Sequence, residues 1–280
     1  MGAHMEHPAS GVIFCATGER YVAMAKAAAA GIRKFDPNVP CDLFSDTDGP
    51  VEGFDQTHKV ENPSRYSKIE AMLNSRFEKT LFLDADTFVV NPISDVFSLL
   101  DRFDIALVHD PEPNSPHGRR LWRQDVPASF PQYNSGVVGL RRTDAVQSLL
   151  NAWLTGLLEG DGGRDQPALR ELLWLSDLRI ATLPPEFNFC DIDQLAFFRR
   201  SSPAPRIVHY FNRKPSKTAD ITPEEVLGSA TLDIIKTLSQ SDGTLEKRPE
   251  LESAARPGFV GKRILQVRAL LEALRVRRRA

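Results

Sequence analysis

Apolar residues follow two alternating patterns along the first two hundred residues. Short apolar runs bounded by Gly, Pro, Asn or Asp predict buried strands. They fall at residues 11–16, 41–45, 80–84, 104–108, 135–140, 178–182 and 206–209. Longer stretches with apolar residues every three or four positions predict helices at residues 19–34, 64–75, 93–100, 144–159 and 165–174. Strands that alternate with helices predict an α/β fold with a mostly parallel, Rossmann-like central sheet.

The pattern changes after residue 215, where only helices are predicted. We therefore expect an α/β domain over residues 9–215 and a helical C-terminal extension over residues 216–280. Residues 1–8 begin with Met-Gly-Ala-His-Met, which resembles a leader left by an expression vector, and we expect them to lie outside the fold. Residues 111–131 lack any period, which suits either a mobile cover over a site or an irregular surface excursion.

Charge is distributed unevenly over the 280 residues. The formal net charge is −2, yet residues 256–280 hold eight Arg or Lys and one acidic residue, so the rest of the chain is clearly acidic. An acidic body argues against binding nucleic acid. Three scattered cysteines and the lack of a bilayer-spanning apolar run predict a cytoplasmic protein.

The basic C-terminal segment also carries an amphipathic pattern. Apolar residues recur at spacings of four and three, at Val260, Ile264, Val267, Leu271 and Leu274. Basic residues lie close to them, at Lys262, Arg263, Arg268, Arg275 and Arg277–Arg279. One interpretation is a helix on an anionic membrane surface, peripheral at its inner face. The other is a helix packed on the α/β domain or on a second subunit of a homo-oligomer.

Candidate chemistry begins at the end of the strongest predicted strand. Asp84 and Asp86 follow the apolar run Thr80-Leu-Phe-Leu, and alternation points both side chains one way and Ala85 the other. Two carboxylates converging at the carboxyl edge of an α/β sheet repel each other unless a cation lies between them. This pattern predicts a divalent-metal site that can bind a diphosphate.

Similar patterns elsewhere favour other interpretations. The triplets at residues 46–48 and 191–193 lie in a Gly-Pro turn and beside a loop, so we interpret them as solvated turn carboxylates. Phosphatases of the haloacid dehalogenase type place a threonine two residues after their second aspartate. Thr87 falls one position too early for that arrangement, which makes this class a distant alternative.

Five segments, in order, resemble the GT-A glycosyltransferases, in particular the retaining transferases of family 8. They are residues 12–17 with Tyr21, 79–90, 133–138, 164–168 and 208–215. The last resembles the family's closing His-x-x-Gly-x-x-Lys-Pro motif, with Asn212 in place of glycine. The resemblance covers residues 11 to 215, so it implies a GT-A catalytic domain over residues 9–215.

The resemblance implies a ligand set for the metal and the nucleotide. Asp84, Asp86 and His209 would hold Mn²⁺ or Mg²⁺, with Ala85 between them and Lys214 on the diphosphate. The structural alternative for His209 is a packed histidine, and the alternative for Lys214 is an ordinary surface lysine. Arg65 and Lys68 would reach ribose or phosphate, unless they form a solvated helix face. Candidates for the base and ribose pocket are Ala16, Thr17 and Tyr21, although Tyr21 also suits the core.

The resemblance also implies residues for the transferred sugar. Asn134 and Asp165 would bind sugar hydroxyls and Gln166 would lie beside the anomeric carbon. Asp165 before Gln-Pro-Ala is also a good helix N-cap, and both roles are compatible.

The function implied is a metal-dependent hexosyltransferase that uses a UDP-sugar donor, with retention, and a saccharide or lipid-linked hydroxyl as acceptor. Inversion would need a carboxylate base, for which Asp191, Asp193 and Glu186 are candidates. Two alternatives are a sugar-phosphate nucleotidyltransferase, which the Thr17-Gly-Glu-Arg turn fits poorly, and a non-catalytic GT-A-like protein that binds nucleotide or carbohydrate.

Overall fold

A seven-stranded sheet forms the centre of the molecule. The computed structural model describes residues 8–116, 118, 120–160, 163–199, 201–211, 213, 215, 219–245 and 259–277. Its strands lie in the order β3-β2-β1-β4-β7-β6-β8. Their bounds are β1 Ser10–Cys15, β2 Cys41–Ser45, β3 Gln56–Lys59, β4 Lys79–Leu83, β6 Ile105–His109, β7 Tyr133–Arg141 and β8 Ile180–Thr182. Within the sheet, β7 runs antiparallel to both of its neighbours, and every other pairing is parallel.

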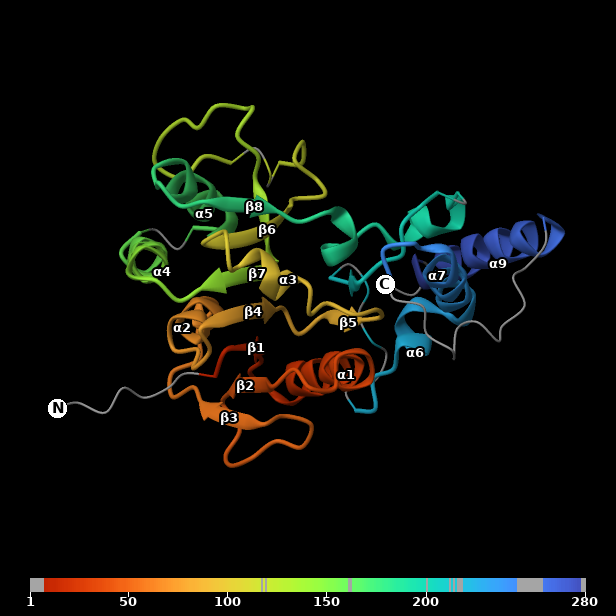
Figure 1. Cartoon of the computed structure of the whole chain (residues 1–280), viewed down its shortest axis with the longest axis horizontal. Coiled ribbons are helices and arrows are strands. Elements are labelled where there is room, and N and C mark those ends of the chain that lie inside the picture. Colours follow the sequence, from red (N-terminus) through yellow and green to blue (C-terminus); the bar gives the residue numbers. More distant parts are fainter. Residues whose placement is uncertain are drawn as a thin grey trace.

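Helices cover both faces of this sheet (Figure 1). One face packs against α1 (Glu19–Phe35) and α3 (Val96–Leu99), the other against α2 (Ser67–Leu73), α4 (Asp144–Leu158) and α5 (Asp165–Trp174). The side chains of β4 alternate between the two faces of the sheet. Leu81 and Leu83 enter the core on the α1 side, and Phe82 enters the core on the opposite side. The prediction of an α/β fold with a mostly parallel sheet is confirmed.

A two-stranded antiparallel sheet of β5 (Thr87–Val89) and β9 (Ile207–His209) lies beyond the end of β4. Two 3₁₀ helices, η1 (Pro185–Asn188) and η2 (Ile192–Phe197), precede β9. The later helices α6 (Pro223–Leu227), α7 (Ser229–Ser241) and α9 (Phe259–Arg277) gather at one end of the molecule (Figure 1). Their apolar residues belong to the same core as the α1 face of the sheet.

Helix α9 packs through one face and exposes another. Ala269 is buried, and the Glu272 carboxylate accepts a hydrogen bond of 3.1 Å from the backbone N–H of Ala230 in α7. The predicted apolar stripe faces outward, since Ile264, Val267 and Leu271 are 55%, 57% and 52% exposed. The side chains of Val260 and Leu274 lie outside the described part of the chain. None of the described helices has the combined length and apolarity needed to cross a membrane.

The structure departs from the predicted elements in two short strands. The sequence did not indicate β3, because Gln-Thr-His-Lys at the sheet edge needs no apolar alternation. Nor did it separate β5 from the strand before it. Residues 111–131 form no helix or strand where they are described, as expected for the long connection between β6 and β7.

Candidate active site

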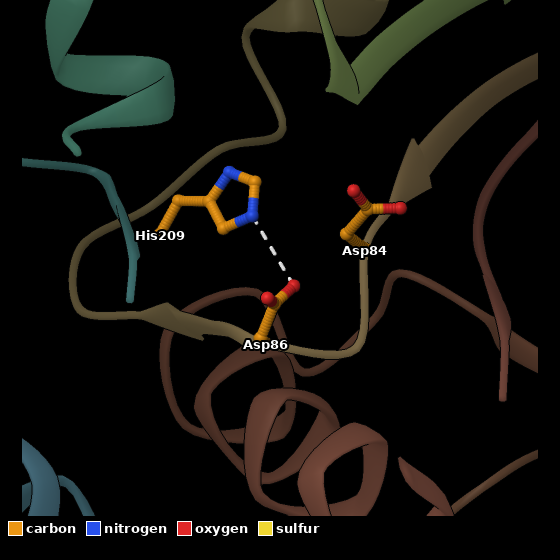
Figure 2. Close-up of side chains that lie close together, drawn as sticks. All are labelled: Asp84, Asp86 and His209. Carbon is orange, nitrogen blue, oxygen red and sulfur yellow. Dashed lines mark hydrogen bonds and ion pairs between the residues drawn. The ribbon is translucent and has the colours of Figure 1, made fainter. Parts of the chain in front are cut away.

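Backbone hydrogen bonds bring three ligand-type side chains together where β4 ends. The N–H of Asp84 donates to the carbonyl of Gly136 in β7 (2.8 Å), and the hydroxyl of Thr87 donates back to the carbonyl of Asp84 (2.8 Å). The chain therefore turns through Asp86 into β5. Pairing of β5 with β9 sets Thr87 opposite His209. Figure 2 shows Asp84, Asp86 and His209 converging from the end of β4, the following turn and β9.

These three residues have the geometry and chemistry of a divalent-cation site. One ligand atom from each lies within 4.8 Å of the others, and Ala85 is buried in the core instead. Gly136 lines the cluster so closely that a Cβ there would stand 2.5 Å from Cε1 of His209 and 2.9 Å from an Asp84 oxygen. Two carboxylates and an imidazole suit Mn²⁺ or Mg²⁺ completed by phosphate oxygens. The described residues therefore fit the metal that the sequence predicts.

Charges within the cluster compensate one another without a metal. Burial raises the pKa of Asp84, and the neighbouring Asp86 charge raises it further. Burial alone would lower the pKa of His209, but its bond from Nε2 to Asp86 Oδ1 (3.2 Å) and the nearby carboxylates raise that pKa to about 10. The same bond outweighs burial at Asp86 and lowers its pKa. A cation would have to displace the proton that joins His209 to Asp86.

A second ion pair lies beside this cluster. Lys68 Nζ is 2.5 Å from Asp165 Oδ2 and donates to Ser135 Oγ (2.8 Å), and Ser135 in turn donates to Asp165 (2.7 Å). Burial alone would raise the pKa of Asp165, but Lys68 and these bonds lower it to about 2. The charges of Asp165 and Asp84 raise the pKa of Lys68 despite its burial. Lys68 is thus a fixed cation and does not belong to a solvated helix face.

The position of Asp165 corrects one sequence interpretation. Asp165 is the first residue of α5 and Arg164 is its N-cap, with no side-chain capping bond. The carboxylate bonds to Lys68 and Ser135 instead, so the N-cap interpretation is wrong. The tertiary ion pair stabilises the carboxylate more strongly than a local bond to a backbone N–H would.

The two predicted sugar-binding amides are held by neighbouring side chains. Asn134 Oδ1 accepts from the backbone N–H of Gly136 (2.8 Å) and from Asn188 Nδ2 (2.8 Å). Gln166 Oε1 accepts from Gln132 Nε2 (3.2 Å), which also donates to Asp110 (3.3 Å). Both amides therefore have defined orientations before any substrate arrives.

The predicted nucleotide turn joins β1 to α1. Ala16 is buried, and Gly18 adopts φ 81°, a conformation that favours glycine, while its N–H donates to Asp46 (2.9 Å). Tyr21 is 54% exposed, which excludes its core alternative. Thr17 is half-buried beside it. The triplet at residues 46–48 therefore stabilises this turn through the hydrogen bond to Asp46.

The basic residues predicted for the nucleotide differ in their placement. Arg65 is exposed, precedes α2 and lies over the ring of Tyr66, with 5.2 Å between guanidinium carbon and ring centroid. Lys68, from the first turn of α2, points into the site, where it contacts Asp165 and Ser135. Lys214 and Asn212 lie outside the described residues.

A cavity of about 940 Å³ opens beside the cluster. Phe211 on its wall lies 5.4 Å from His209 between ring centroids. The other lining residues include Asp110, Asn188, Cys190, Asp191, Asp193, Tyr210 and Arg213. Asp193 is paired with Arg213, and Asp191 accepts from Gln194 (2.6 Å). The cavity has the volume of a small-molecule site, and its lining residues Asn188 and Phe211 both contact His209 of the cluster.

Sequence reasoning missed three residues that organise this site: Ser135, Gln132 and Asn188. Ser135 lies in the Tyr133–Val138 stretch whose Asn134 was chosen, so its signal was at hand. Gln132 precedes that stretch directly. Asn188 ends a 3₁₀ helix with no recognisable pattern around it. Only the fold brings it to His209.

The chain is similar to a known protein family and to a solved structure. The family model described as nucleotide-diphospho-sugar transferase matches residues 63–218, more than half of the chain. No match is found among curated proteins. A solved structure of the galactosyltransferase LgtC, in complex with donor and acceptor sugar analogues, superimposes with a TM-score of 0.54 at 14% identity. That alignment covers 86% of this chain and 98% of the other, which shows a shared fold.

Proposed function

Because the chain belongs to the nucleotide-diphospho-sugar transferases, we propose that it is a divalent-metal-dependent hexosyltransferase that uses a UDP-sugar. The observation that carries this proposal is the convergence of Asp84, Asp86 and His209 beside Asn134 and Asp165. A bound Mn²⁺ or Mg²⁺ would neutralise the charge that develops on the departing diphosphate.

The residues of the chain divide the remaining work. Asp165, kept ionised by Lys68, accepts from hydroxyls of the donor sugar, and Asn134 donates to another. Gln166 lies next to the anomeric carbon, with Gln132 holding its carbonyl oxygen. Because these groups are oriented in advance, little reorganisation is needed when charge develops on the sugar ring.

We place the acceptor in the cavity beside His209. Its wall offers carboxylates that can accept from sugar hydroxyls and the ring of Phe211, 40% exposed, against which a sugar can pack. We propose retention, because Asp193 and Asp191, two of the three candidates for an inverting base, are engaged with Arg213 and Gln194. The third, Glu186, keeps a buried carboxylate oxygen without a hydrogen-bond partner among the described residues, so it is the base that an inverted product would implicate. Proton NMR of the first-formed product would test this, and an inverted anomeric coupling would contradict it.

Binding of UDP followed by calorimetry, with and without Mn²⁺, tests the proposal. We expect Mn²⁺ to tighten UDP binding at least tenfold and Asp84→Asn to abolish that gain. Asp48→Asn is the matched control, since its side chain is 97% exposed in another Asp-x-Asp triplet. Slow release of UDP from UDP-sugars would establish turnover. Binding without any turnover would instead favour the non-catalytic alternative.

The outward face of α9 extends the proposal to a membrane surface. Ile264, Val267 and Leu271 are exposed next to Arg263 and Arg268, a combination that suits the interface of an anionic bilayer. We infer peripheral attachment at the cytoplasmic side, where a lipid-linked acceptor would be within reach. The protein-packing alternative holds for the opposite face, through Ala269 and Glu272.

Vesicle co-sedimentation tests this attachment in the full chain. The double substitution Val267→Ser and Leu271→Ser should release the protein from vesicles with 30% anionic lipid while leaving its melting temperature unchanged. Leu175→Ser is the control substitution, because Leu175 is 61% exposed and directly follows α5, away from α9 in the sequence. Equal binding of all three proteins would contradict attachment through α9.

A further inference from the structure

A chain of hydrogen bonds links the metal cluster to the predicted sugar-binding amide. The backbone N–H of Gly136 donates to Asn134 Oδ1 (2.8 Å), and Asn188 Nδ2 donates to the same oxygen (2.8 Å). Asn188 Oδ1 lies 2.9 Å from Nδ1 of His209. All three side chains are buried, with exposures of 8%, 3% and 4% for Asn134, Asn188 and His209.

The first donor fixes the direction of every later bond. A backbone N–H can only donate, so the oxygen of Asn134 must face Gly136. That oxygen can only accept, so Asn188 presents its NH₂ group to Asn134 and its own oxygen to the histidine. The oxygen of Asn188 can only accept as well, which places a proton on Nδ1 of His209.

Two consequences follow, one at each end of this series of hydrogen bonds. At His209, Nδ1 carries a proton, so Nε2 is the nitrogen that can bind a metal. Nε2 lies on the side of Asp86. At Asn134, the engaged oxygen leaves the amide NH₂ as the group that can donate to a sugar hydroxyl. Asn188 therefore sets the metal-binding nitrogen of His209 and, together with the backbone N–H of Gly136, holds the sugar-binding donor of Asn134 in place.

We propose that Asn188 is a positioning residue that couples metal binding at His209 to donor-sugar binding at Asn134. The inference rests on the proposed function for its metal and its sugar, whereas the bonds themselves exist in the protein without ligands. Partners that orient a metal-bound imidazole typically contribute about 10- to 100-fold to metal affinity.

Two substitutions separate the two roles. Asn188→Ala removes both bonds, so Mn²⁺ affinity in the presence of UDP should fall about 10- to 100-fold. Asn188→Asp keeps an acceptor for His209 Nδ1 but sets a carboxylate against the oxygen of Asn134. Mn²⁺ affinity should then stay close to that of the unmodified protein, while KM for the UDP-sugar rises about tenfold, the scale of one lost hydrogen bond. Asn151→Asp, on the exposed surface of α4, is the matched control.

Nitrogen-15 NMR of histidine-labelled protein reads the tautomer directly. His209→Asn identifies the resonances of His209, and Mg²⁺ with UDP serves as the diamagnetic ligand pair. We expect a protonated Nδ1 in the unmodified protein and in Asn188→Asp, and a changed nitrogen pattern in Asn188→Ala. An unchanged tautomer together with unchanged Mn²⁺ affinity in Asn188→Ala would overturn the proposal.

The ligand-free protein keeps the two proposals distinguishable. If the unmodified protein fails to bind Mn²⁺ with UDP, the proposed function fails, yet the Nδ1–H of His209 should still exchange slowly with solvent. Asn188→Ala should accelerate that exchange, and equal exchange in both proteins would refute the Asn188–His209 bond. Should Asn188→Asp unfold, as shown by circular dichroism, Asn188→Ala and this exchange measurement still decide the outcome.

Discussion

The buried pair of Lys68 and Asp165 allows a prediction with a magnitude. The substitution Lys68→Met keeps the length and apolar stem of the side chain and removes its charge. Asp165 then retains Ser135 as a partner but loses the cation 2.5 Å from its carboxylate. Because the two side chains are only 18% and 25% exposed, water cannot replace that cation efficiently.

The pKa of Asp165 sets the scale of the effect. Its fall from 3.8 to about 2 corresponds to about 2 kcal/mol in favour of the ionised form. Lys68 supplies most of that stabilisation, and an unpaired buried carboxylate carries a further desolvation cost. We therefore expect Lys68→Met to lower the free energy of unfolding by about 2 to 4 kcal/mol at pH 7.

Urea unfolding as a function of pH tests both size and sign. A depressed pKa contributes stability above pH 3.8 that is lost as pH falls towards 2, so the two proteins should converge in that window. Lys26→Met is the control, because Lys26 is 44% exposed and 3.8 Å from an exposed Glu52; it should cost less than about 0.5 kcal/mol. The reasoning is refuted if Lys68→Met destabilises no more than Lys26→Met.

Three further predictions follow from the site. Mn²⁺ affinity measured by calorimetry should rise up to about tenfold per pH unit between pH 6 and 8, because His209, with a pKa of about 10, must release a proton; a flat profile would contradict this. Gly136→Ala should weaken Mn²⁺ binding at least tenfold through its contact with His209, whereas Gly243→Ala, with open space around it, should not. The Glu171 carboxylate accepts hydrogen bonds from the backbone N–H groups of Arg123 (2.8 Å) and Gln124 (3.0 Å). Glu171→Ala removes both bonds, so limited proteolysis within residues 111–131 should accelerate, and unchanged cleavage would argue against this anchor.

Much of the fold could be predicted because its signals are local. An apolar run followed by an Ala-rich stretch is sufficient to indicate β1 and α1, and similar contrasts mark β4 and α4. The strands that escaped prediction are stabilised by their neighbours: β3 is a polar edge strand paired with β2, and β5 exists through its pairing with β9. Pairing over such distances leaves no period in the sequence.

The site residues also differ in whether local sequence or a distant tertiary contact determines their placement. Asp84 and Asp86 could be predicted, since two residues on one extended segment share a direction. The contact of Lys68 with Asp165 could not, because it joins the first turn of α2 to the start of α5 across almost a hundred residues. The Asp165 N-cap interpretation failed for this reason: a local rule was outweighed by a partner from another helix.

The charges of the site suggest why metal and nucleotide should bind together. Without ligands, the carboxylates of Asp84, Asp86 and Asp165 face two cations, Lys68 and protonated His209. A divalent cation that displaces the His209 proton adds only one net positive charge, so electrostatic attraction alone favours it modestly. In the proposed function, protein groups would supply three ligands and phosphate oxygens would complete the coordination. Binding of either partner must then strengthen binding of the other by the same factor. Lys68 would not leave in this exchange, because its partner Asp165 lies outside the proposed ligand set, so it would remain a permanent cation beside the proposed diphosphate site.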